Sequence, residues 1–176
     1  MSFSASARKA LDTSLPLGLR HTALRHCVWM YCPIGYHATH SFIQATVGDF
    51  TRDPSLLPAA LEMLTASYNA WQTELRAYGL MRSHAKRLGQ RAPHPSALNP
   101  NRRLRWYGAP REAALHAVWF WYSQGASADV DVQALAVALL ERGRFTEEQR
   151  EIFERVRAEP GVSWRVVQQM EVVVGA

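Results

Sequence analysis

Hydrophobic residues recur with a helical period over much of the chain, most clearly across residues 57–78. Large apolar side chains in this stretch are separated by alternating steps of four and three residues: Leu57, Leu61, Leu64, Tyr68, Trp71, Leu75 and Tyr78. This spacing places all of them on one stripe of an α-helix, whereas a strand would require a period of two. The pattern predicts a long helix over about residues 55–88, with Ser55 as N-cap, Pro58 in the first turn and Gly79 as a weak point.

Shorter helical patterns precede and follow this long helix. The predicted helices before it cover about residues 4–12, 19–31 and 37–50, and those after it cover about 110–125, 129–142, 146–158 and a last segment from Ser163. Thr146 and Gln149 form a capping-box pattern. Residues 115–122 are apolar on nearly every side, which predicts a helix that is central or lies in an interface. The β-branched residues 172–174 could fray or pair as a short strand.

The sequence therefore predicts an all-α protein, built as a single-domain bundle of about six to eight helices over residues 1–176. Residues 144–176 are a possible C-terminal helical subdomain. The length of 176 residues fits one domain, and 48% apolar content suffices for a packed core. The longest apolar run, residues 27–32, is far below the roughly 20 residues of a membrane span. The N-terminal residues lack the apolar segment of a secretory signal, so we expect a cytoplasmic protein without membrane association.

A basic, proline-rich segment follows the long helix. Prolines at positions 93, 95, 100 and 110 predict a loop over about residues 89–109, a length typical of functional or disordered loops. No acidic residue occurs across residues 82–111, which form the predicted basic helix end and loop. The bases of this segment are Arg82, Lys86, Arg87, Arg91, Arg102, Arg103, Arg105 and Arg111, and two aromatic residues, Trp106 and Tyr107, directly follow Arg105.

Charge is unevenly distributed along the chain. The net charge of +5 is the sum of +2 for residues 1–53 (five bases, three acids), +7 for residues 54–111 (nine bases, two acids) and −4 for residues 112–176 (six bases, ten acids). A basic middle beside an acidic C-terminal part suits a polyanionic partner on one face. It also suits head-to-tail self-association between copies.

Arginines next to aromatic residues are typical of nucleic-acid binding. Guanidinium groups contact phosphates bidentately, and a neighbouring ring such as Trp106 or Tyr107 offers a platform for a base. We therefore expect a nucleic-acid partner, with RNA favoured over DNA. Two other interpretations of the segment stay open: an inhibitor or adaptor that docks an acidic protein surface, and a solvated loop paired with the acidic residues 112–176.

A second cluster of chemically versatile residues lies nearer the N-terminus. Cys27, Cys32, His37 and His40 could supply four zinc ligands, which keeps a metal-binding regulator as a second alternative. Their spacing departs from that of structural zinc sites, and cysteines with apolar neighbours more often belong to a core. No nucleotide-binding, metalloprotease or nucleophile motif occurs. We therefore predict no catalytic residue, no cofactor and no metal site, and a non-enzymatic protein.

In size, helicity and its arginine-rich segment over residues 82–111, the chain resembles the helical small subunits of multi-subunit CRISPR effector complexes. Those proteins stack in copies along a ribonucleoprotein and touch nucleic acid through arginine-rich faces. The resemblance implies a non-enzymatic assembly subunit that contacts phosphates and neighbouring protein subunits.

Overall fold

The computed structural model describes residues 2–91, 93, 99–102, 105–125, 129–159 and 164–175, the side chains of Arg102 and Trp164 excepted. Of these residues 77% are helical, and none lies in a strand, so the predicted all-α class is confirmed. The α-helices within the described ranges are α1 (Phe3–Leu11), α2 (Leu17–Met30), α3 (Tyr36–Val47), α4 (Leu57–Arg87), α5 (Pro110–Ser123), α6 (Val130–Arg142), α7 (Glu147–Ala158) and α8 (Trp164–Gly175). Two short 3-10 helices, η1 (Pro54–Leu56) and η2 (Pro100–Arg102), lie before and after α4.

Helix ends follow local chemistry closely. The capping box at the start of α7 is confirmed, with Thr146 Oγ1 accepting from Gln149 N–H and the Gln149 side chain accepting from Thr146 N–H. The predicted N-cap of α4 is wrong, because residues 54–56 form η1. Asp53, whose carboxylate accepts from Ser55 N–H at 2.9 Å, caps η1 instead. Residues 172–174 continue α8 rather than pair as a strand, since Val173 is buried in the core there.

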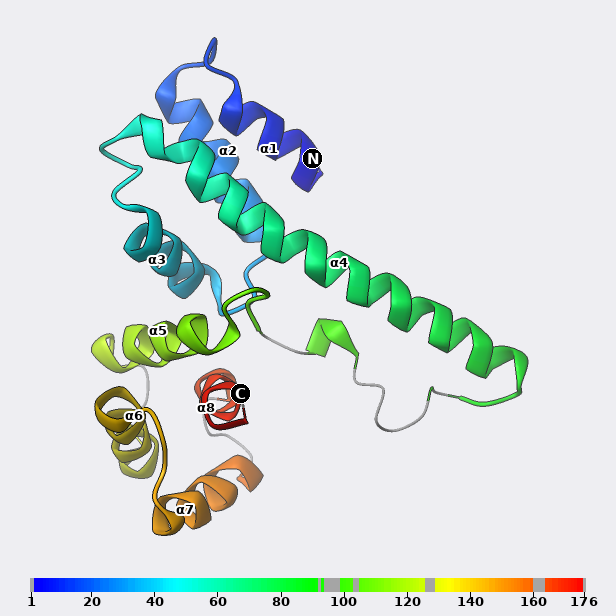
Figure 1. Ribbon diagram of the computed structural model, residues 1–176, viewed down its shortest axis with the longest axis vertical. Coiled ribbons are helices and arrows are strands. Elements are labelled where there is room, and N and C mark those ends of the chain that lie inside the picture. The colour runs from blue at the N-terminus through cyan, green and yellow to red at the C-terminus, as the bar shows by residue number, and fades with distance from the viewer. Residues whose placement is uncertain are drawn as a thin grey trace.

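Helices α1–α4 enclose a first hydrophobic core (Figure 1). Helix α2 contributes Leu24, Cys27 and Val28, α3 contributes Ile43, and the first half of α4 supplies an apolar row that includes Leu64. Aromatic rings close one end of this core, where Phe3, Tyr31, Tyr68 and Trp71 pack against one another. The first part of the apolar stripe predicted over residues 57–78 therefore faces this core.

A second hydrophobic core lies between α5, α6, α7 and α8 (Figure 1). Leu135 and Leu139 from α6 meet Phe153 of α7 and Met170 of α8. The division of the chain at residue 144 stays a prediction, although this core draws on residues from both sides of that position.

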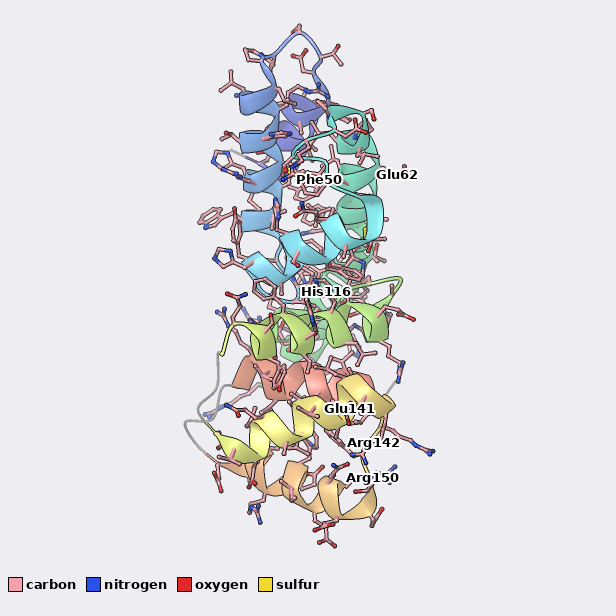
Figure 2. All side chains as sticks on the ribbon, turned by 90° about the vertical axis from the view of Figure 1, so that its left-hand side faces the viewer. Phe50, Glu62, His116, Glu141, Arg142 and Arg150 are labelled. Atoms are coloured by element: carbon pink, nitrogen blue, oxygen red, sulfur yellow. The ribbon has the colours of Figure 1, made fainter. Side chains whose placement is uncertain are left out.

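Helix α5 belongs to both cores. Ala113 and Ala117 face the first core, whereas Ala114 and Val118 face the second, and all four side chains are fully buried. Figure 2 shows α5 running between α3 above it and α6 and α8 below it. The expectation that this apolar helix is central is confirmed, because small residues on its two sides let both layers of helices approach closely.

The second half of α4 projects from the body of the protein as an arm (Figure 1). Its apolar stripe is buried from Leu57 to Leu64 and half-buried at Tyr68 and Trp71. Beyond Tyr78 the side chains are exposed, except for that of Ala85, which is buried. We call residues 76–87 the arm. Although α4 has 31 residues, neither it nor any other helix in the described ranges is both long and apolar enough to cross a membrane.

Candidate nucleic-acid interface

Three of the expected phosphate-binding residues stand on the exposed end of the arm. The side chains of Arg82, Lys86 and Arg87 are all exposed, and Arg91 lies exposed just beyond the helix. None of these four forms an ion pair within the described part of the chain. Arg82 and Lys86 are four residues apart and therefore share one side of the helix. These side chains are available to an anionic partner.

The charge of the arm is not balanced locally. Glu74 is the last acidic residue before the arm, and the sequence has no further acid until Glu112. The arm also carries Arg76 and His84, both exposed. Because exposed like charges on a projecting helix are favourable only when a counter-charge arrives, this distribution suits an anionic surface or polymer.

Apolar side chains are exposed beside these cations. Leu80 is 73% exposed, and Met81 and Leu88 are also exposed. Met81 and Leu88 are about two turns apart and lie on one side of the helix, away from the side of Lys86. The arm therefore offers two kinds of surface, one cationic and one apolar.

Arg105 and Tyr107 are held against α4 instead of reaching into solvent. A guanidinium nitrogen of Arg105 forms an ion pair with Glu74, and the Tyr107 hydroxyl donates to the other carboxylate oxygen at 2.6 Å. The Arg105 guanidinium also lies 4.7 Å from the centre of the Tyr107 ring. These contacts engage the guanidinium group through which Arg105 was expected to bind phosphate, and they place that group against the Tyr107 ring.

A hydrogen-bonded group of buried side chains continues from this cluster into the core. The Tyr107 N–H donates to Ser67 Oγ at 2.9 Å, and the Tyr31 hydroxyl lies 2.8 Å from the same oxygen. Burial raises the pKa of Tyr31 above its ordinary range, against a smaller opposing effect of the Ser67 hydrogen bond. The chain around residue 107 is thus fixed to the middle of α4.

Trp106 lies inside the protein, so the expectation that it stacks on bases is wrong for this structure. Its side chain is 2% exposed and packs edge-on against Phe42, with ring centres 5.2 Å apart. Burial of an indole stabilises the core by a large apolar area, and a base could reach this ring only after the core opened. Trp106 is therefore a core residue.

The remaining basic positions of the segment fall into two groups. Arg111 begins α5 and donates to the Gly143 carbonyl at 2.8 Å, which links α5 to the end of α6. Arg102 ends η2, but its side chain lies outside the described residues, as does all of Arg103. The predicted loop over residues 89–109 also falls partly outside them. The interface that the structure supports is accordingly the arm with Arg91.

The four Cys and His candidates for a metal site do not form one cluster. Cys27 is buried with its thiol 3.7 Å from the Phe3 carbonyl, and burial raises its pKa to about 11. Cys32 is half-buried, His37 is exposed and His40 is half-buried. Among the residues the structure describes, no group of three or more His, Cys, Asp or Glu side chains is arranged to hold a metal ion. The cysteines are free thiols.

Sequence reasoning missed Glu74 as a partner of the basic segment. The only signal was that Glu74 and Glu62 are the two acids among residues 54–111, and Glu62 points outward from α4 in Figure 2.

The chain matches no protein-family model, no curated protein and no solved structure.

Proposed function

We propose that this protein is a non-enzymatic nucleic-acid-binding protein that contacts phosphates through the arm of α4. The observation that carries the proposal is a set of exposed cations at and just beyond the end of α4, a stretch without any acid, which form no ion pair with the residues that the structure describes: Arg82, Lys86, Arg87 and Arg91. A role as a subunit of a ribonucleoprotein assembly, with RNA favoured over DNA and other protein subunits as partners, is part of this proposal.

Projection of the arm supports binding along a polyanion. A helix that leaves the body can lie against a nucleic-acid strand without bringing the acidic residues 112–176 near the phosphates (Figure 1). Four phosphate contacts would give a slope of about −3 for log affinity against log salt with single strands. Binding should therefore weaken steeply with salt.

The test is a fluorescence-anisotropy titration with labelled RNA and DNA at several salt concentrations. The variant Arg82→Gln/Lys86→Gln/Arg87→Gln should weaken binding at least about ten-fold at low salt and flatten the slope to about −1. Helicity and thermal stability should not change, because these side chains contact no other described element through an ion pair.

A matched control removes the same charge elsewhere. Arg8→Gln/Lys9→Gln/Arg144→Gln also replaces two arginines and one lysine, all exposed and distant from the arm. It should retain most of the affinity. Equal losses in the two triple variants would show that only net charge matters and would refute a dedicated interface on the arm.

One observation favours a second candidate, an inhibitor or adaptor that docks an acidic protein. Leu80 and Met81 of the arm and Leu88 just beyond it are exposed, and amphipathic helices commonly bind by laying apolar side chains into a groove. In that case Met81→Gln/Leu88→Gln would abolish partner capture, whereas nucleic-acid affinity would be weak in the unmodified protein and independent of the arm cations.

A further inference from the structure

Helices α2 and α3 carry a second, separate cationic surface. Residues 13–48 contain no acidic residue but include Arg20 and Arg25, together with histidines at positions 21, 26, 37 and 40. Arg20 is engaged, since its Nε–H donates to the Ala10 carbonyl at 3.0 Å. Four of the seven histidines of the chain are thus concentrated where no carboxylate of the same segment can neutralise them.

The fold brings several of these groups together. His21 and Arg25 are four residues apart on α2 and share one side of that helix. His40 of α3 faces the same side, because Arg25, His37 and His21 all lie close enough to influence it electrostatically. Phe50 anchors the cluster: its carbonyl oxygen lies 3.0 Å from His21 Nε2, and its ring is 5.1 Å from that of His40. In Figure 2 Phe50 lies between α2 and α4.

Trp29 stands beside this cluster with its ring in solvent. Its side chain is 72% exposed, the largest exposure of any described tryptophan, and it follows Arg25 by one helical turn on the same stripe of α2. At this spacing the ring can stack on a base while the guanidinium contacts a phosphate of the same strand. We call His21, Arg25, Trp29, His37 and His40 the α2–α3 face.

We propose that the α2–α3 face is a second contact surface for single-stranded nucleic acid, with Trp29 stacking on a base, Arg25 binding the adjacent phosphate, and His40 strengthening binding once it is protonated. An unpaired strand is the fitting occupant, because only unstacked bases offer a free face to an aromatic side chain. The inference rests on the proposed function for its ligand class but on different residues for its geometry.

Other groups around His40 set the direction of the pH effect. Burial lowers its pKa, Arg25, His37 and His21 lower it further, and Asp49, on the loop after α3, partly opposes them. Asp49 is itself engaged with Arg52 at 3.4 Å and with the Gln44 side chain at 2.9 Å. On the far side of α3, His116 of α5 lies 2.9 Å from Ser41 Oγ, and α4 presents apolar residues such as Leu61 and Leu64. A bound phosphate would add to the counter-charge that Asp49 supplies.

The test uses the full chain with the arm triple variant Arg82→Gln/Lys86→Gln/Arg87→Gln as background. A short fluorescein-labelled oligouridylate is titrated at about pH 5 and about pH 8, because the pKa of His40 lies below its ordinary value of about 6.5. Affinity should be about three-fold higher at the lower pH, as expected for one added charge near a phosphate. His40→Gln should remove most of this difference.

Two single substitutions test the stacking and phosphate contacts. Trp29→Ala should weaken binding about ten-fold, whereas Trp119→Ala, which removes another exposed tryptophan on α5, should not change it. Arg25→Gln should weaken binding, and Arg144→Gln, with the same change of charge at the start of the loop before α7, should not. Equal effects within either pair would overturn the proposal.

Further outcomes separate this inference from competing ones. If polyglutamate displaces the oligonucleotide as well as unlabelled oligouridylate does, the face binds acidic chains in general and the nucleic-acid assignment fails. If Trp29→Ala changes the sedimentation of the protein but not oligonucleotide affinity, the face is a contact between copies. The arm is tested in the otherwise unmodified protein, whereas the α2–α3 face is tested in a background that lacks the arm cations. A negative result for either surface therefore does not change the conclusion about the other.

Discussion

The hydroxyl of Tyr107 donates a hydrogen bond of 2.6 Å to Glu74, thirty-three residues earlier in the chain. Glu74 lies in the middle of α4, at the point where this helix leaves the body, and also pairs with Arg105. Through these two contacts the Glu74 carboxylate holds residues 105–107 against α4, next to the start of the arm. This contact decides which cations of the segment remain available, since it engages Arg105 and leaves Arg82 exposed.

Removing this contact should loosen the segment without unfolding the protein. We expect Tyr107→Phe to lower the free energy of unfolding by about 1 kcal/mol, because a partly buried carboxylate loses one donor. Glu74→Gln should cost a similar amount, and the double variant should cost less than the sum of the two single variants. Urea denaturation measures all three. Tyr122→Phe, at an exposed tyrosine of α5, is the control and should have no effect.

Gly35 offers a sharper test of the packing between α3 and α5. Its φ of +92° favours glycine, and a Cβ at this position would lie 3.2 Å from the Trp121 ring. Gly35→Ala should therefore lower the free energy of unfolding by roughly 2 kcal/mol, from backbone strain and displacement of the indole. Thermal and urea denaturation would show the change.

Gly79→Ala is the matched control for that substitution. Gly79 lies inside α4 with a negative φ and no atom within 4 Å of a built Cβ, so alanine should stabilise the helix by about 0.5–1 kcal/mol. Opposite signs for the two glycine substitutions are expected. A neutral Gly35→Ala would mean that the contact with Trp121 is not tight.

The buried thiol of Cys27 should make stability fall in alkaline solution. Burial raises its pKa from 9.0 to about 11 in the folded protein. Between these values the unfolded chain releases a proton that the folded chain keeps, so the unfolded state is favoured as pH rises. The loss should begin at about pH 9 and reach roughly 2–3 kcal/mol near pH 11.

Urea denaturation between about pH 8 and pH 10 measures this dependence. Cys27→Ala should flatten the curve over that range, even though it lowers stability somewhat at every pH. The raised pKa values of Tyr31 and Tyr107 add a further decrease only above their ordinary value of 10.0. An unchanged slope in Cys27→Ala would show that the thiol titrates as it does in water.

Local signals explain why the helices could be predicted so fully. The alternating spacing from Leu57 onward, the Thr146 capping box and the apolar circumference of residues 115–122 each depend on residues within a few turns of one another. The error at Ser55 has the same scale: the Ser55 hydroxyl donates to Asp53 instead of capping α4, and Asp53 caps a 3-10 turn two residues earlier.

The candidate site was less predictable because tertiary contacts decide it. Trp106 follows an arginine in the sequence, as a stacking residue would, yet the fold places it against Phe42, sixty-four residues away. In the same way, the ion pair with Glu74 makes Arg105 unavailable to a nucleic acid. By contrast, the cations of the arm are exposed, as nucleic-acid binding requires, because α4 extends beyond the other helices. Although η2 folds back against α4 and Ala85 is buried, these cations stay exposed.

Helix α5 sets a rule for dividing this chain experimentally. Ala113 and Ala117 are buried in the first core, and Ala114 and Val118 are buried in the second. Cutting the chain on either side of α5 would therefore expose apolar core side chains in one of the two fragments. An N-terminal fragment ending before Pro110 would lack α5, which packs against α3. A C-terminal fragment starting after Ser123 would also lack α5, which packs against α6 and α8. Only fragments that both retain residues 110–123 could each keep a closed core, so the two halves must share that helix and not divide it.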